Sequence, residues 1–145
     1  MNSDIPSETS EARKDPDIAT EQSRLHWGAN ETINLLQTYA AVNKPFFIRW
    51  DPPEPHLPNI VPEPYASMYS PEEIPVWGSF GDTFENKPYI QRQQLRSWMV
   101  EEWTWKDWSR IISLYFGEIT LMDHEIGHKY SPNLHSNRIL QSNIR

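Results

Sequence analysis

The sequence predicts a mainly α-helical protein of about three helices, with one short strand, an extended proline-rich arm and flexible N- and C-terminal tails. Apolar residues recur at helical spacing in three segments, and six of the 13 prolines fall within residues 52–64. The 145 residues are enough for one small domain. We expect a disordered acidic tail over residues 1–24, a single Trp- and Pro-rich domain over residues 25–128 and a flexible basic tail over residues 129–145.

Helices are predicted over residues 31–42, over residues 88–103 and from Thr104 onward. Thr104 and Asp107 have the spacing of a capping box, which starts a helix. A stripe that includes Trp108, Tyr115 and Met122 follows, and we expect this stripe to be the buried face of the last helix. The Ser131-Pro132 pair is expected to end it, because proline removes a backbone donor.

Two other segments have clear local signals. Residues 45–50 read PFFIRW, an aromatic and β-branched run that predicts the strand. The following segment, residues 52–64, is rich in proline and is expected to be an extended arm rather than an inner strand. Ser70-Pro71 has the chemistry of a short helix start, and the loop after it carries Trp77 and Phe80 as candidate anchors.

The composition excludes several classes of protein. The chain has no cysteine and a net charge of −7, which argues against thiol chemistry, paired-cysteine metal sites and a general grip on nucleic acid. It has no apolar run of 18 residues, so we expect no membrane insertion. With no basic and apolar leader at the start, we expect a cytoplasmic or nuclear location.

One motif has the pattern of an active site. Residues 124–128 read HEIGH, which places His124 and His128 one helical turn apart on one face with Glu125 beside them. This motif resembles that of the zincin metallopeptidases. The resemblance implies that the two histidines bind zinc and that Glu125 acts as general base.

A catalytic zinc site also needs a third protein ligand, and the chain offers few. The nearest downstream donor is His135, seven residues after His128, whereas the long zincin motif has a spacing of six. The alternative is a solvated polar face near a helix end, where a cationic histidine is favourable for the helix dipole.

Two features predict binding surfaces. Arg49, Pro52 and Pro55 have the spacing of a proline-rich ligand, with Trp50 next to the arginine, although the arm can instead pack on the protein's own aromatic residues. Four tryptophans lie too close in sequence to share one helix face, so some are expected at an interface or in an indole-rich core; they are Trp98, Trp103, Trp105 and Trp108.

These observations favour a non-enzymatic, small acidic adaptor or accessory protein that binds another protein through the arm and the tryptophan-rich helical surface. No cofactor is expected in that case. The alternative is a compact zinc-dependent metallohydrolase, peptidase-like, that uses the HExxH at residues 124–128.

Overall fold

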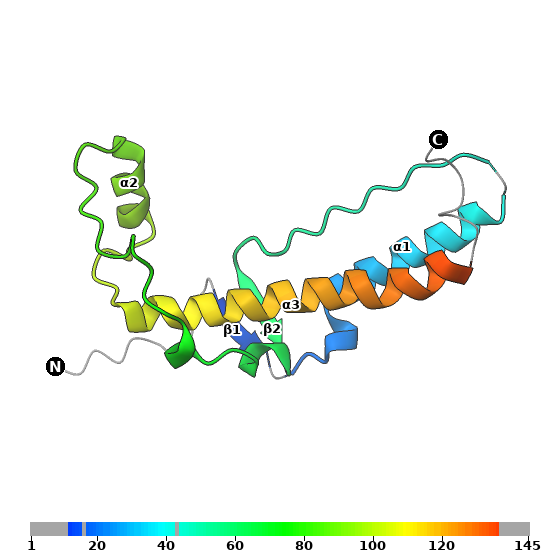
Figure 1. Ribbon diagram of the computed structural model, residues 1–145, viewed down its shortest axis with the longest axis horizontal. Helices are drawn as coiled ribbons and strands as arrows, with labels where there is room; N and C mark the ends of the chain where they lie inside the picture. The colour runs from blue at the N-terminus through cyan, green and yellow to red at the C-terminus, as the bar shows by residue number, and fades with distance from the viewer. Residues whose placement is uncertain (1–11, 16, 43, 137–145) are drawn as a thin grey trace.

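The long helix α3 (Trp105–Ser136) is the axis of the molecule (Figure 1). The computed structural model describes residues 12–15, 17–42 and 44–136, and it describes residues 128–136 as backbone only. Helix α1 (Arg24–Ala40) packs beside one half of α3, while α2 (Tyr89–Ser97) stands away from the other end (Figure 1). The predicted mainly α-helical class is confirmed, with three α-helices in the described part of the chain.

A two-stranded parallel sheet lies against the middle of α3. Strand β1 (Ala12–Asp15) pairs with β2 (Asn59–Pro62), and Ala12 is opposite Asn59. Val61 of β2 is fully buried, because the sheet contacts α3. Part of the segment expected to be a disordered tail therefore forms β1 and a 3-10 turn, η1 (Thr20–Gln22), while residues 1–11 of that predicted tail lie outside the described residues.

The strand predicted over residues 45–50 is wrong, and the strand lies in the proline-rich segment instead. Residues 45–53 form an irregular run with no strand pairing, residues 54–58 form a turn and bends, and Phe47 is 87% exposed. Proline has no backbone N–H to donate in a sheet, but Pro62 is the last residue of β2, where this loss disturbs the strand pairing least. The β-branched and aromatic composition of residues 45–50 did not decide the outcome, since β1 pairs with residues 59–62.

Helix α1 begins at Arg24, seven residues before the predicted start at residue 31. The Ser23 side chain accepts a hydrogen bond from the backbone N–H of His26 (3.2 Å), which caps the helix. Gly28 lies inside this helix, and its lack of a side chain leaves room for the Trp50 ring. A Cβ at this position would lie 2.8 Å from the indole nitrogen. The Ser23 cap and this packing explain why the helix begins earlier than predicted.

The buried face of α3 differs from the predicted stripe. Tyr115 and Ile119 are about two-fifths exposed, whereas Gly117, Glu118 and Leu121 are buried. A Cβ at Gly117 would clash with the carbonyl oxygen of Tyr65 in the 3-10 turn η2 (Tyr65–Ser67). The predicted stripe is wrong at these positions because the sheet and η2 approach α3 closely on the face that carries small and polar residues, and not on the face that carries Tyr115.

The two ends of α3 had opposite outcomes. Its start is confirmed, because the Asp107 carboxylate accepts from both the backbone N–H and the hydroxyl of Thr104 (2.8 and 2.6 Å). Ser131-Pro132 does not end it, since the helix runs to Ser136; a proline removes one hydrogen bond without forcing a stop. Part of the predicted flexible basic tail is thus helical, and residues 137–145 lie outside the described residues.

The second helix is shorter than predicted. α2 ends at Ser97, and Trp98 and Met99 follow it, with Met99 at a φ of 55°. The Ser70-Pro71 signal gives one 3-10 turn, η3 (Pro71–Glu73), which ends before Pro75. Within the described residues, no helix combines the length and the apolar character needed to cross a membrane.

Candidate functional site

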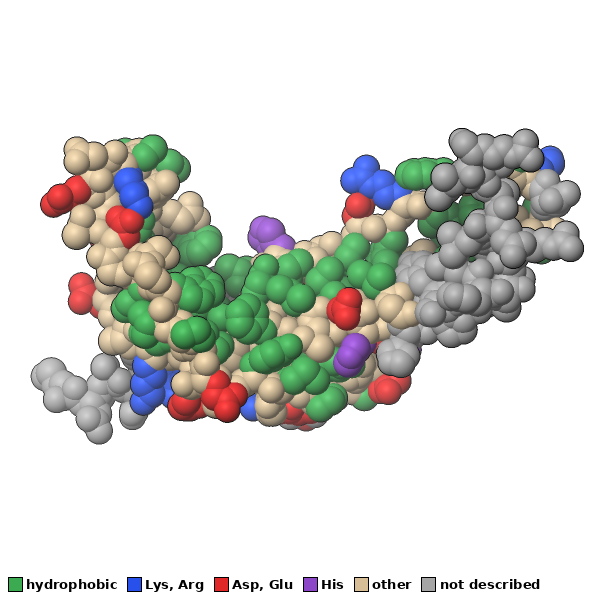
Figure 2. Space-filling model, viewed as in Figure 1, with side chains coloured by type: hydrophobic (Ala, Val, Ile, Leu, Met, Phe, Trp, Pro, Cys, Tyr) green, Lys and Arg blue, Asp and Glu red, His purple; other side chains and the backbone are tan. Residues whose placement is uncertain are grey.

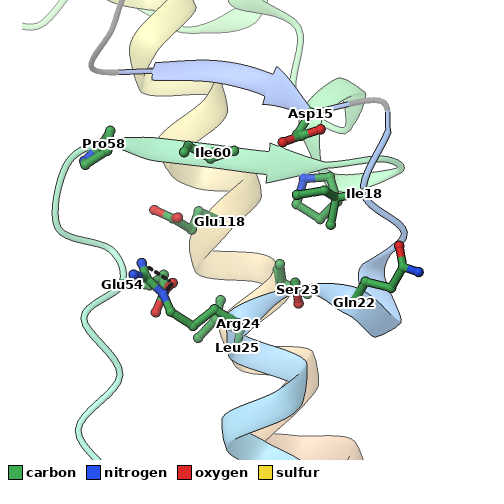
Figure 3. Close-up of a pocket in the computed structure, with 12 residues that line it drawn as sticks. Asp15, Ile18, Gln22, Ser23, Arg24, Leu25, Glu54, Pro58, Ile60 and Glu118 are labelled. Carbon is green, nitrogen blue, oxygen red and sulfur yellow. Dashed lines mark hydrogen bonds and ion pairs between the residues drawn. The ribbon is translucent and has the colours of Figure 1, made fainter.

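A cavity of about 370 Å³ lies where the arm, the sheet and the start of α1 meet α3 (Figure 3). Glu54 reaches into it from the arm, Glu118 from α3 and Arg24 from the first turn of α1. Asp15, at the end of β1, also lines the cavity. Apolar residues make up most of the remaining wall; they are Ile18, Leu25, Pro58, Ile60, Pro62 and Leu121.

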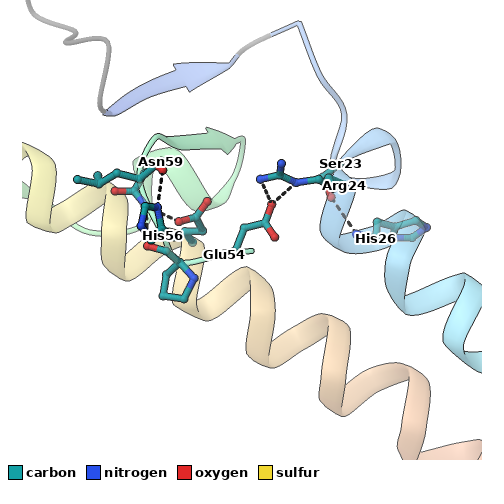
Figure 4. Close-up of polar contacts among 9 residues, drawn as sticks. Ser23, Arg24, His26, Glu54, His56 and Asn59 are labelled. Atoms are coloured by element: carbon teal, nitrogen blue, oxygen red, sulfur yellow. Dashed lines mark hydrogen bonds and ion pairs between the residues drawn. The ribbon is translucent and has the colours of Figure 1, made fainter. Parts of the chain in front are cut away.

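Glu54 is the most constrained acid of the cavity. Its side chain is 7% exposed, and one oxygen, Oε1, accepts from both Nε and Nη2 of Arg24 at 2.7 Å (Figure 4). The other oxygen, Oε2, is buried and has no hydrogen-bond partner among the described residues. A buried carboxylate oxygen without a donor is costly, so this corner of the cavity can accept a further hydrogen bond.

Glu118 and Asn59 form a second buried polar pair. The Asn59 amide donates to Oε2 of Glu118 (2.5 Å) and to the carbonyl oxygen of Pro55 (3.2 Å). Burial is the main cause that raises the pKa of Glu118, and the charge of Glu54 acts in the same direction. The hydrogen bond from Asn59 and the charge of Arg24 lower it, and the net result is a pKa of about 7. Glu118 therefore changes its charge near neutral pH.

The HExxH segment lies on α3, as the sequence predicted. The side chains of His124 and Glu125 each form a hydrogen bond with another residue of the chain. His124 Nδ1 hydrogen-bonds the hydroxyl of Tyr65 (2.9 Å), and the two rings meet edge to face. Burial raises the pKa of Tyr65, as do the charges of Glu125 and Glu21, so this hydroxyl stays protonated at neutral pH. Tyr65 thus links η2 to α3.

Glu125 points toward α1 rather than toward a shared site with His124. Its Oε1 lies 3.0 Å from Nδ1 of His26, and the carboxylate is buried between the two helices. Among the side chains that the structure describes, no group of three or more His, Cys, Asp or Glu is placed to hold a metal ion. The side chains of His128 and His135 lie outside the described set, so the zinc interpretation stays a prediction.

The residues predicted for binding on the arm have mixed positions. Arg49 is exposed and pairs with Asp51 (2.7 Å), whereas Trp50 packs on α1 at Gly28. Pro52 and Pro55 are half-buried. The arm therefore uses part of its surface on the protein's own first helix, which was the alternative that the sequence left open.

The four tryptophans divide in the same way. Trp105 meets Trp77 and Phe80 edge to face, at centroid distances of 5.8 and 5.2 Å, and its indole N–H donates to the carbonyl oxygen of Ile74. Its role is thus to hold the loop between η3 and α2.

The other members of the cluster range from paired to exposed. Trp103 and Trp108 also meet edge to face, at 5.2 Å, and both are half-buried. Trp98, in contrast, is half exposed. It is the member of the cluster best placed to contact a partner.

Sequence reasoning missed the acidic cavity. Its members are separated by up to about a hundred positions and become neighbours only when α1, the arm and α3 assemble. One signal was present: Glu118 lies at helical spacing between the buried Gly117 and Leu121, where an acid is unusual.

Comparison with known proteins gives two partial similarities, and no family model matches the chain. The chain is 30% identical over 111 residues to an arylsulfatase of Clostridium perfringens (strain 13 / Type A), which covers 73% of the chain and 22% of that protein. It is 34% identical over 65 residues to an uncharacterized protein of Haemophilus influenzae (strain ATCC 51907 / DSM 11121 / KW20 / Rd), 45% of the chain and 34% of that protein. The chain thus spans about a fifth and a third of these relatives.

Proposed function

We propose that this chain is a non-enzymatic binding component that associates with another protein surface through its arm and its α2 region. The observation that carries the proposal is the balance of apolar burial. Nine apolar residues are buried among those described, whereas twenty large apolar side chains are exposed. Exposed apolar surface of this extent is typical of an interaction site.

The shape supports a single docking face. In Figure 2 the outline is hollowed between the α2 end and the arm, and hydrophobic side chains gather along the middle, over α3. We define the docking face by five exposed side chains on its two flanks: Phe47 of the arm and Tyr89, Ile90, Trp98 and Met99 of the α2 region. Trp98 and its neighbours provide the aromatic area that interface hot spots use.

We propose an arylsulfatase-like polypeptide as the partner. The similarity to the arylsulfatase covers most of this chain and only 22% of that protein, so most of the relative has no counterpart here. We expect the remainder of such a protein to pack on the docking face. It can be a separate partner or another part of one polypeptide. Sulfate ester hydrolysis would then belong to the assembly rather than to this chain.

A complementation experiment tests this proposal. The C. perfringens arylsulfatase, shortened by removal of its matching residues, is mixed with the chain, and association is measured by sedimentation. Hydrolysis of 4-nitrophenyl sulfate is the second readout. We expect a one-to-one complex that Trp98→Ala weakens about tenfold or more, whereas Gln93→Ala, an exposed polar change on the preceding helix α2, leaves it unchanged. No association by the unmodified chain would contradict the proposal.

The zinc-dependent metallohydrolase remains the second candidate, because α3 is continuous through residues 124–128 and thus places both histidine positions on one face. Its test is metal content and thermal melting, with and without chelator. One zinc per chain, lost in His124→Ala and kept in His56→Ala, would support it. His56 is a suitable control because it is exposed, and the hydrogen bond described for its ring is to the carbonyl oxygen of the adjacent Leu57.

A further inference from the structure

The cavity between the arm, the sheet, α1 and α3 has a polar corner whose acceptors are not all used. Glu54 is nine-tenths buried, and Figure 3 shows it reaching from the arm into the space below β2. Its Oε2 lacks a donor among the described residues. A carboxylate oxygen is an acceptor, so a group that fits this corner must bring a hydrogen-bond donor.

The charge around the cavity is negative. Asp15, Glu54 and Glu118 line it, and Arg24 is the basic residue among the lining side chains. Arg24 directs two N–H groups to the same oxygen of Glu54, which leaves the other oxygen without compensation. A complementary ligand is therefore positively charged as well as rich in donors.

The rest of the wall determines the shape of that ligand. Ile60 and Pro58 of the sheet side, and Leu25 and Leu121 of the two helices, present apolar surface next to the acidic corner. A volume of about 370 Å³ is of the size of a small-ligand pocket. An apolar stem that ends in a compact cation satisfies both parts of the wall.

We propose that this cavity binds a primary alkylammonium group, with its ammonium on Glu54 and its alkyl stem along Ile60, Leu25 and Leu121. The group can belong to a free amine or to a lysine side chain of a partner. The proposal does not depend on the docking face, because the cavity residues lie outside the five side chains that define that face.

Glu118 makes the binding depend on pH. The groups that face it are Asn59 from β2, Glu54 from the arm and Arg24 from α1, with Asp15 on the same cavity wall. Because the pKa of Glu118 is about 7, the cavity gains a negative charge as pH rises from 6 to 8. An alkylammonium keeps its charge throughout this range. We therefore expect binding to be about tenfold tighter at pH 8 than at pH 6.

The test is calorimetric titration of the full chain with n-butylammonium chloride, with 1-butanol as the neutral probe of the same stem. We expect the amine to bind and the alcohol not to bind detectably. Glu54→Gln should weaken amine binding about 10- to 100-fold, since it removes the charge on the free oxygen. Glu102→Gln, an exposed acid outside the cavity, is the matched control and should bind like the unmodified chain.

A second variant keeps the proposal testable if Glu54→Gln fails to fold. Glu118→Gln should bind the amine with the same affinity at pH 6 and pH 8. The peptide acetyl-Gly-Lys-Gly-amide and its norleucine counterpart separate the two sources: binding of the lysine peptide assigns the site to side chains, and binding of butylammonium alone assigns it to free amines. Equal binding of amine and alcohol, or an unchanged pH dependence in Glu118→Gln, would overturn the proposal.

Discussion

The molecule has two regions that use apolar residues in opposite ways. In the body, formed by α1, the sheet and α3, Leu25, Val61 and Leu121 are at most 3% exposed. In the lobe, formed by residues 75–103 and centred on α2, the helix buries none of its residues, and Tyr89 and Ile90 are more than three-fifths exposed. Aromatic contacts to Trp105 connect the lobe to the body.

This difference shows which region the chain can stabilise alone. Short isolated helices are marginal in water, and α2 has nine residues and no buried side chain to support it. Its apolar residues therefore need a cover that the described part of the chain does not provide. The body holds the fold, and the lobe is the region that we propose for a complex.

The largest expected contrast comes from truncating one apolar side chain in each region. Leu121→Ala should lower the free energy of unfolding by about 2–5 kcal/mol, because a fully enclosed side chain leaves a cavity. Ile90→Ala should change it by less than about 0.5 kcal/mol, because that side chain is already solvated. Urea unfolding measures both values, and equal losses would remove the distinction between body and lobe.

A pH series sharpens the description of the body. The pKa of Glu118 is raised from 4.5 to about 7, so the folded protein binds this proton more tightly than the unfolded chain does. Ionising Glu118 costs free energy of folding. This cost is nearly absent below about pH 4.5, grows between pH 4.5 and 7, and is almost complete above about pH 7. Glu118→Gln should therefore stabilise the protein by up to about 3 kcal/mol at pH 8.

The pH 4.5 measurement is the control for that variant. At this pH Glu118 is protonated in the folded state and about half protonated in the unfolded state, so Glu118→Gln should change the free energy of unfolding by less than about 0.5 kcal/mol. A gain of the same size at both pH values would mean that the substitution acts through packing and not through the buried charge.

The smallest of the three effects concerns two glycines of α3. Gly117→Ala should destabilise the body by about 1–3 kcal/mol, because the new methyl group would clash with the Tyr65 carbonyl oxygen. A methyl group at position 127 would meet no other atom within 4 Å. Gly127→Ala should therefore stabilise the helix by about 1 kcal/mol, because alanine favours a helix more than glycine does. Thermal melting of both variants checks the opposite signs, and a stabilising Gly117→Ala would disprove the close approach of η2.

The sequence predicted those features that depend on local chemistry. The Thr104–Asp107 start of α3 and the short turn at Ser70-Pro71 are set by side chains a few residues apart, and both are confirmed. The choice of strand was not predictable in this way. Residues 59–62 pair with β1 from the N-terminal segment, and such pairing depends on a contact between distant residues.

The candidate sites followed the same rule. The HExxH was visible because its residues are contiguous, whereas the partners of His124 and Glu125 are Tyr65 and His26, which lie 59 and 99 positions away. The Glu54–Arg24 and Asn59–Glu118 pairs likewise required the assembled fold. For the tryptophans, sequence spacing indicated that the cluster would divide without showing that Trp105 faces inward and Trp98 outward.

Amide hydrogen exchange of α2 tests the central claim most directly, in the free chain and in a mixture with the shortened C. perfringens arylsulfatase. We expect the amides of Tyr89–Ser97 to exchange near the unprotected rate in the free chain and at least about tenfold more slowly in the mixture. Amides around Leu121 should be protected in both samples. An α2 helix that is already protected in the free chain, or one that stays unprotected in the mixture, would contradict the claim that the lobe is a docking surface.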